Sequence, residues 1–283
     1  MDVSSRRLTA PSFMLANHYR EVFYLKRIFS IVLSLLFLCS CSFNATLKSS
    51  SESLSLSEKK QGWGFKKTES GPEFTSSQKE IMKKYNCIYH GNPEEKVLYL
   101  TFDEGYENGY TPLILDTLKE KGVPAAFFVT GPYVKNEPEL ILRMAKEGHI
   151  IGNHTVNHPS VPNISTEELV RELSELDRLI FGVCKKTTKY FRPPMGEYSE
   201  RTLHAATSLG YINTFWSFAY VDWNNNVSKE EAKKNILKAF HNGTVILLHA
   251  VSRGNAEALG EAIDIAKKEG YVFKSLDEYP GQR

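Results

Sequence analysis

The feature that most constrains the fold is a regular alternation between short apolar runs and segments of helical period across residues 97–275. The apolar runs predict seven strands, at 97–102, 124–130, 149–154, 188–192, 212–217, 244–249 and 271–275. The intervening segments carry helix-start signals, including capping boxes that begin at Ser165 and Ser228. Strands that alternate with helices form a parallel sheet covered by helices, so we expect an α/β fold, closed into a barrel or doubly wound.

The composition indicates one large domain with appendages. The chain has 283 residues, of which 41% are hydrophobic and 24% charged, as in an ordinary globular protein. The formal net charge of +2 is too balanced to favour nucleic acid or another polyanion as a partner.

The N-terminal region resembles an export signal. Lys26 and Arg27 precede the apolar run 28–39, which is shorter than the roughly 20 residues that span a bilayer. The run ends in LCSC at 38–41, which resembles a bacterial lipobox with Cys41 as the lipidated residue. We therefore expect residues 1–41 to be a signal and lipoprotein segment, with the protein exported to the outer face of the cytoplasmic membrane and the cell wall. The alternatives are an uncleaved membrane anchor and a start at Met14.

Three further regions follow this segment. Residues 42–60 are Ser-rich and read as a flexible linker. Residues 61–96 are expected to form an N-terminal extension packed on a catalytic domain at 97–283. An exported protein could pair Cys87 with Cys184, but their flanks do not call for a disulfide, and a domain of this size can bury enough surface without one.

Chemically active residues gather where predicted strands end. The five clusters are Asp103-Glu104, NHTVNH at 153–158, RPPMG at 192–196, VDW at 221–223 and His249. Functional groups in parallel α/β folds collect beyond the C-terminal ends of the strands. If the sheet closes, these clusters meet on one rim.

The first two clusters suggest a metal and a base. His154 and His158 are four apart, and in a helical turn both imidazoles would share one face, as divalent-metal sites require. Two histidines and one carboxylate leave open positions for water and substrate. Of Asp103 and Glu104, one can ligate the metal and the other can act as a general base. The alternatives are polar loop histidines and an exposed acidic turn.

The remaining clusters suggest a charge partner and an acid. Arg192, aimed by the prolines that follow it, can keep a neighbouring carboxylate ionised. His249 can act as a general acid, with Asp222 orienting its imidazole. The alternatives are a surface arginine, a core histidine and a plain turn aspartate. Base, acid and metal together favour hydrolysis of an unactivated bond such as an amide, whose leaving amine must be protonated.

The motifs TFDEG, HTVNH, RPPMG, VDW and LLHA, in this order, resemble the polysaccharide deacetylases of the NodB-homology type, carbohydrate esterase family four. The resemblance covers about residues 97–278. QGWGFKK at 61–67, GHIIGNH, YVDW and SRGNAEAL look more narrowly like the delta-lactam-biosynthetic de-N-acetylase branch. The family fold is a distorted (β/α) barrel, often with fewer than eight strands, which agrees with about seven parallel strands here.

The resemblance implies a role for each site residue. Asp103 would be the base, Arg192 would tune it, and His249 would be the acid paired with Asp222. A divalent metal, with zinc the expected ion, would be held by His154, His158 and Glu104. Glu104 departs from the usual Asp of the family and from the Asn frequent in the branch, which leaves its ligation of the metal open.

Aromatic residues near the rim are candidates for sugar binding. We expect Tyr106, Trp223 and Pro193 to contact the substrate. The alternative is that the rim aromatics, Tyr110 and Trp216 among them, belong to the core.

The resembled branch removes the acetyl group from N-acetylmuramic acid in peptidoglycan glycan strands that have lost their stem peptides. The freed amine can then close a delta-lactam, a step in spore-cortex maturation that requires an N-acetylmuramoyl amidase to act first. Two alternatives are retained. One is an N-acetylglucosamine or chitooligosaccharide deacetylase, and the other is a catalytically silent, glycan-binding wall lipoprotein.

Overall fold

The computed structural model describes residues 56–223 and 227–280. The predicted signal and lipoprotein segment, Cys41 included, and most of the Ser-rich linker lie outside these residues. In the described part of the chain, no helix has the length and apolar character needed to cross a membrane.

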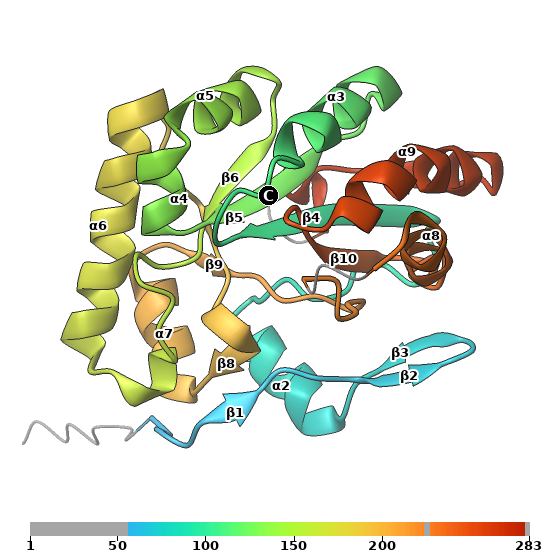
Figure 1. Ribbon diagram of the computed structural model, residues 1–283. Coiled ribbons are helices and arrows are strands. Elements are labelled where there is room, and N and C mark those ends of the chain that lie inside the picture. The colour runs from blue at the N-terminus through green and yellow to red at the C-terminus, as the bar shows by residue number, and fades with distance from the viewer. Residues whose placement is uncertain (1–55, 224–226, 281–283) are drawn as a thin grey trace, which may run out of the picture. The chain divides into compact units, whose positions relative to one another are not determined.

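A seven-stranded parallel sheet forms the centre of the fold (Figure 1). Its strand order is β10-β4-β5-β6-β7-β9, and β11 pairs with the start of β4. The strands are β4 (Val97–Glu104), β5 (Ala125–Val129), β6 (Ile150–Asn153), β7 (Tyr190–Phe191), β9 (Ile212–Asn213), β10 (Thr244–His249) and β11 (Val272–Phe273). All seven predicted strands are therefore present and parallel, although several are shorter than predicted.

The sheet curls toward closure between β9 and β10. The predicted strand 212–217 forms only two residues of ladder as β9, and the chain then leaves β7 and crosses to β10. There Phe218 makes a single parallel bridge with Ile246, and the backbone N–H of Leu247 donates to the carbonyl of Phe218 at 2.9 Å. The result is a distorted (β/α) barrel, as predicted.

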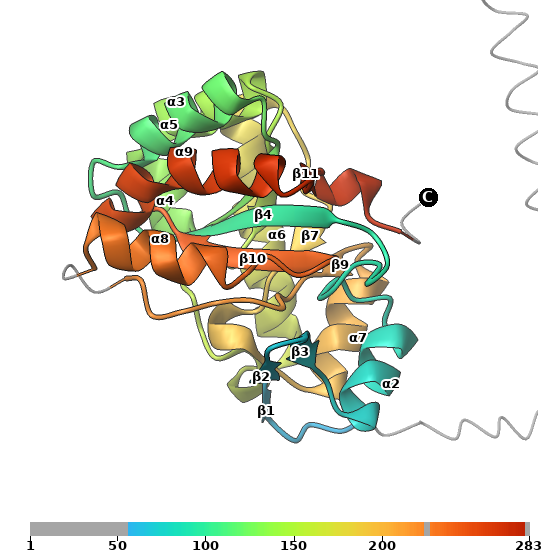
Figure 2. The same cartoon turned by 90° about the vertical axis from the view of Figure 1, so that its right-hand side faces the viewer.

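Helices cover the outer face of the sheet (Figures 1 and 2). They are α3 (Thr111–Lys121), α4 (Gly131–Asn136), α5 (Pro138–Lys146), α6 (Thr166–Cys184), α7 (Glu200–Ser208), α8 (Lys229–Leu237) and α9 (Arg253–Lys268). Ser165 caps α6 and Ser228 caps α8, because each hydroxyl accepts a hydrogen bond from the backbone N–H three residues later. Each predicted capping box therefore has its hydrogen bond from the backbone N–H to the serine hydroxyl.

The segment before β4 packs on the barrel. Its elements are β1 (Gln61–Gly62), β2 (Lys66–Thr68), β3 (Gly71–Glu73) and α2 (Ser76–Lys84). β1 pairs with β8 (Glu197–Tyr198), and the indole N–H of the buried Trp63 donates to the carbonyl of Trp216 at 2.7 Å. Three short 3₁₀ helices, Val161–Asn163, Pro194–Gly196 and Leu276–Glu278, complete the described elements. Cys87 and Cys184 are free thiols.

Strand β4 separates two environments. Its side chains alternate between faces, and Leu98, Leu100 and Phe102 belong to the main core beneath the helices. Tyr99 belongs to the smaller cluster on the opposite face. By the same alternation Asp103 and Glu104 leave β4 on opposite faces, which decides their different surroundings.

Candidate active site

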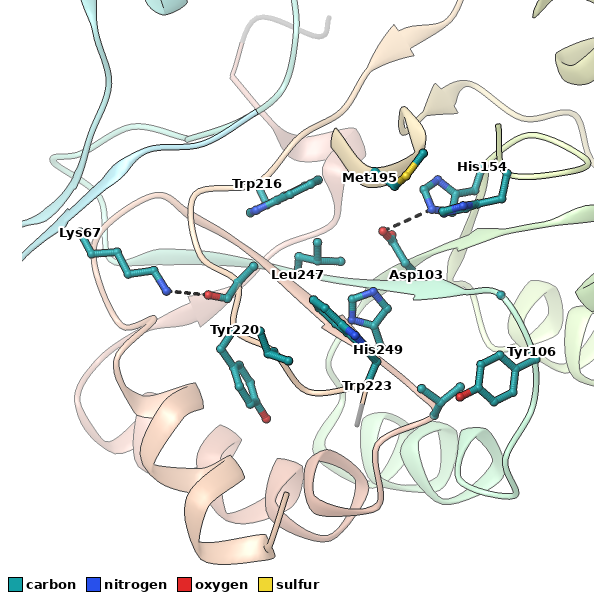
Figure 3. Close-up of a pocket in the computed structure, with 15 residues that line it drawn as sticks. Lys67, Asp103, Tyr106, His154, Met195, Trp216, Tyr220, Trp223, Leu247 and His249 are labelled. Atoms are coloured by element: carbon teal, nitrogen blue, oxygen red, sulfur yellow. Dashed lines mark hydrogen bonds and ion pairs between the residues drawn. The ribbon is translucent and has the colours of Figure 1, made fainter. Parts of the chain in front are cut away.

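A cavity of about 750 Å³ opens at the C-terminal ends of β4 and β10 (Figure 3). The segments that the sequence placed on one rim meet here, because parallel strands present their C-terminal ends on the same side. The cavity is lined by Lys67, Asp103, Gly105, Tyr106, His154, His158, Met195, Trp216, Ala219, Tyr220, Val221, Trp223, Leu247, His249 and Val251.

Asp103 is held as a carboxylate by Arg192. The Nη1 atom of Arg192 donates to Oδ1 of Asp103 at 2.6 Å, and its Nη2 atom donates to Oγ1 of Thr101 at 2.8 Å. Burial alone would raise the pKa of Asp103, but the charge of Arg192, helped by His154 and His249, leaves this pKa lowered. Asp103 is therefore ionised at neutral pH, as a proton acceptor must be.

Arg192 itself is fully buried and fixed in place. Its guanidinium lies 4.1 Å from the ring centroid of Phe128 and donates to the backbone carbonyl of Phe215 at 3.3 Å. The predicted surface-arginine alternative is thus wrong. Thr101, which orients Arg192 from β4, was missed in the sequence because a threonine inside an apolar strand carries no signal of its own.

His154 and His158 come together, but not on a helical turn as predicted. They lie in the loop after β6, where Thr155 and His158 adopt positive φ angles of 65° and 55°. Such angles are rare for a β-branched residue such as Thr155 and are frequent at functional sites. The two imidazole rings are 4.8 Å apart in a T-shaped arrangement.

The hydrogen bonds of His154 fix its tautomer. Its Nδ1 atom lies 2.7 Å from the backbone carbonyl of Arg192, so Nδ1 carries the proton and donates. Burial lowers the pKa of His154 to about 4, which leaves Nε2 unprotonated at neutral pH. This Nε2 atom lies 3.5 Å from Oδ2 of Asp103. Two acceptors placed in this way are suited to sharing a proton or a cation.

His249 and Asp222 form the second reactive pair. Nδ1 of His249 donates to Oδ1 of Asp222 at 2.7 Å, and the backbone N–H of His249 donates to Oδ2 at 2.8 Å. The side-chain amide of Asn255 also donates to Oδ2, at 2.5 Å. Burial would lower the pKa of His249, but the hydrogen bond and charge of Asp222 outweigh it and leave the pKa raised. Asn255, which fixes Asp222, was not singled out from the sequence.

Glu104 does not belong to the residues that surround the cavity. It is fully buried, does not line the cavity, and neither carboxylate oxygen has a hydrogen-bond partner. Burial, with the nearby charges of Glu107 and Asp103, raises its pKa well above the usual range. Within residues 56–223 and 227–280, no three His, Cys, Asp or Glu side chains are arranged as a metal-binding group.

Two of the three residues predicted to contact the substrate line the cavity, and one does not. Tyr106 and Trp223 are 56% and 51% exposed and line the cavity, and Trp223 packs edge-on against His249 with a centroid separation of 5.0 Å. Pro193 is buried and does not line the cavity; Met195, two residues later, does. Lys67, from the N-terminal segment, was missed as a lining residue.

Two histidines fit a divalent metal. His154 presents an unprotonated Nε2 atom whose orientation is fixed by its other nitrogen, as in metal-ligating histidines, and His158 lies beside it. The carboxylate within ion-pair distance of His154 is that of Asp103 rather than Glu104.

Comparison with known proteins identifies the family. A model of the polysaccharide deacetylase family matches residues 90–214. The peptidoglycan-N-acetylmuramic acid deacetylase PdaA of Bacillus subtilis is 46% identical over 221 residues, which are 76% of this chain and 84% of PdaA. The chain belongs to the polysaccharide deacetylases, a family of hydrolases that cleave N-acetyl amide bonds and generally use a metal.

Solved structures agree with this assignment. The structure of Bacillus subtilis PdaA, a family 4 carbohydrate esterase, matches with a TM-score of 0.77 and 44% identity, over 79% of this chain and 98% of that one. A family 4 carbohydrate esterase from Bacillus anthracis matches with a TM-score of 0.70 and 42% identity, over 81% and 100% of the two chains.

Proposed function

We propose that this protein hydrolyses the N-acetyl group of N-acetylmuramic acid in peptidoglycan strands that have lost their stem peptides. The observation that carries the proposal is the convergence of an ionised Asp103 and an Asp222-paired His249 in one cavity. The substrate assignment is supported by the likeness to PdaA over most of both chains.

The reaction uses the two pairs in turn. Asp103 removes a proton from the attacking water, while Arg192 keeps its carboxylate ionised. His249 donates a proton from Nε2 to the leaving amine, and Asp222 stabilises the imidazolium through Nδ1. An amine is too basic to leave as an anion, so this protonation is required for the amide bond to break.

A divalent metal, with zinc the expected ion, is proposed to bind His154 and His158. When bound, it would supply a Lewis acid beside Asp103. His154 contributes a neutral Nε2 atom, and the carbonyl of Arg192 holds its ring in place.

The cellular context follows from the substrate and the N-terminal sequence. Export through the segment 1–41, with lipidation at Cys41, would place the enzyme at the outer face of the membrane beside the wall. An amidase must first remove the stem peptide, since the proposed substrate carries a free lactyl carboxyl. The freed amine can then attack that carboxyl to close the delta-lactam of spore cortex.

Acetate release from peptide-stripped peptidoglycan tests the proposal. We expect release by the wild type, with Asp103→Asn and His249→Ala reduced by at least about 100-fold while remaining folded. Mass spectrometry of the digested product, with and without chelator, then identifies the modified sugar and the metal requirement. Acetate lost from N-acetylglucosamine instead would favour the alternative deacetylase, and glycan binding without any acetate release would favour a silent binding protein.

A further inference from the structure

The second lysine of the QGWGFKK segment lies at the cavity, far in sequence from the reactive groups. Lys67 belongs to β2 and lines the cavity together with Asp103 and His249. Figure 3 shows it at one end of the cavity, with Asp103 and His154 at the other. Among the described lining residues, Lys67 is the one lysine or arginine.

Lys67 is exposed, and its ammonium group has no counter-charge among the described residues. Its Nζ atom donates to the backbone carbonyl of Ala219 at 2.7 Å and lies 5.3 Å from the ring centroid of Phe218. No carboxylate among the described residues lies within ion-pair distance of it, whereas its neighbour Lys66 pairs with Glu73 at 3.1 Å. An ammonium group can make three hydrogen bonds, so two donors of Lys67 remain available to a ligand.

The charged groups around Lys67 favour the binding of an anion. Lys67 also lines a neighbouring cavity of about 650 Å³ that contains Lys238, and the exposed Glu69 is the acidic residue among its lining side chains. Partial desolvation, with the like charge of Lys238, lowers the pKa of this exposed lysine. A carboxylate beside Lys67 would offset both effects, because an opposite charge stabilises the ammonium form.

We propose that Lys67 binds the lactyl carboxylate of a muramic acid residue other than the one being deacetylated. This inference rests on the proposed function. Peptidoglycan without stem peptides carries a free lactyl carboxylate on every second sugar, whereas chitin-like strands carry none. The separation of Lys67 from Asp103 within the cavity places the recognised group away from the reacting acetamide. Lys67 thereby selects acidic, peptide-free strands.

The proposal is tested by comparing the wild type with Lys67→Met, both as the full chain, on two substrates. The substrates are peptide-stripped strands and the same strands with their lactyl carboxyls converted to neutral amides. We expect Lys67→Met to lower kcat/KM about tenfold on the acidic strands and to leave the amidated strands nearly unchanged. Lys67→Arg should retain most of the preference, and Lys66→Met should match the wild type on both substrates.

The alternative is a purely structural role, in which Lys67 only anchors the loop at Ala219. In that case Lys67→Met would lower activity equally on both substrates, and this result would overturn the proposal. A disaccharide with one lactyl group should be turned over equally by Lys67→Met and the wild type, because its single lactyl carboxylate belongs to the sugar that is deacetylated. A tenfold loss on the disaccharide would overturn the assignment to a second sugar.

The inference can fail separately from the proposed function. If the wild type releases no acetate from either strand, the proposed function is wrong. The role of Lys67 can then still be tested by measuring the equilibrium binding of both strands through tryptophan fluorescence. Acidic strands bound about tenfold more tightly than amidated strands, with the difference lost in Lys67→Met, would support the inference. Equal affinities would overturn it.

Discussion

Asp103 and His249 are register partners at the C-terminal ends of β4 and β10. Residues paired in this way leave the same face of neighbouring strands, which lie about 4.8 Å apart. Both side chains line one cavity, where the pKa of Asp103 is lowered and that of His249 is raised. Over a shared pH range the carboxylate is therefore ionised while the imidazole is protonated, which is the state that the proposed base and acid require.

This pairing predicts a bell-shaped pH dependence whose alkaline limb depends on Asp222. Activity should fall at low pH as Asp103 is protonated and at high pH as His249 loses its proton. Because Asp222 raises the pKa of His249, Asp222→Asn should move the alkaline limb to lower pH and leave the acid limb in place. A pH profile of kcat/KM measures both limbs. An alkaline limb that does not move would exclude His249 as the group that titrates there.

The buried pair of Arg192 and Asp103 makes a separate prediction for stability. Arg192→Met leaves the Asp103 carboxylate buried without its cation, which should lower the free energy of unfolding by about 3 kcal/mol or more at pH 7. Since the wild-type carboxyl has a lowered pKa, the stability that it contributes is present above its unfolded-state pKa and is lost as pH falls. The deficit of the variant should therefore shrink in acid.

The double variant Arg192→Met with Asp103→Asn is the control, because it removes both charges. It should be more stable at pH 7 than Arg192→Met alone, as measured by chemical denaturation. Equal stability of the single and double variants would mean that the Asp103 charge does not cause the loss.

Metal binding distinguishes the histidines from Glu104. His154→Ala should weaken zinc binding by at least about tenfold, because it removes a fixed, neutral Nε2 atom from the cavity. Glu104→Gln should change zinc affinity by less than about threefold, because the Glu104 carboxylate does not line that cavity. Titration calorimetry on chelator-stripped protein measures both. Equal losses in the two variants would show that Glu104 turns toward the histidines and ligates the metal.

The parallel α/β class and the meeting of the five clusters were predictable because both follow from the alternation of apolar runs with helical segments, whereas the strand order was not predicted. A parallel sheet sends the ends of all its strands to one rim, so Asp103 and His249 could be placed together without coordinates. Arg192 was predictable as a partner for the same reason.

Other features depend on packing that no local pattern encodes. The loop geometry at Thr155 and His158 arises from positive φ angles, which the HTVNH sequence does not signal. Asn255 and Thr101 act only through contacts with Asp222 and Arg192 across the barrel. The opposite placement of Asp103 and Glu104 follows from strand alternation, but it requires that β4 continue to Glu104, two residues beyond its predicted end.

The final prediction concerns the effect of the buried Glu104 carboxyl group on stability. The pKa of Glu104 is raised in the folded protein. As the pH rises, the carboxyl group therefore loses its proton first in the unfolded chain, near its ordinary pKa of 4.5. The free energy of unfolding should therefore fall as pH rises through that range. Glu104→Gln removes the ionisable group, and at pH 7 it should be more stable than the wild type by about 1–3 kcal/mol, with the two converging near pH 4.

Chemical denaturation between pH 4 and pH 8 measures this difference, and Glu94→Gln, at an exposed site, should follow the wild type throughout. A Glu104→Gln variant that is less stable than the wild type at pH 7 would contradict the prediction. It would show that the carboxylate is ionised and has a cationic partner, and a bound metal would then be the first candidate to test by repeating the measurement with chelator.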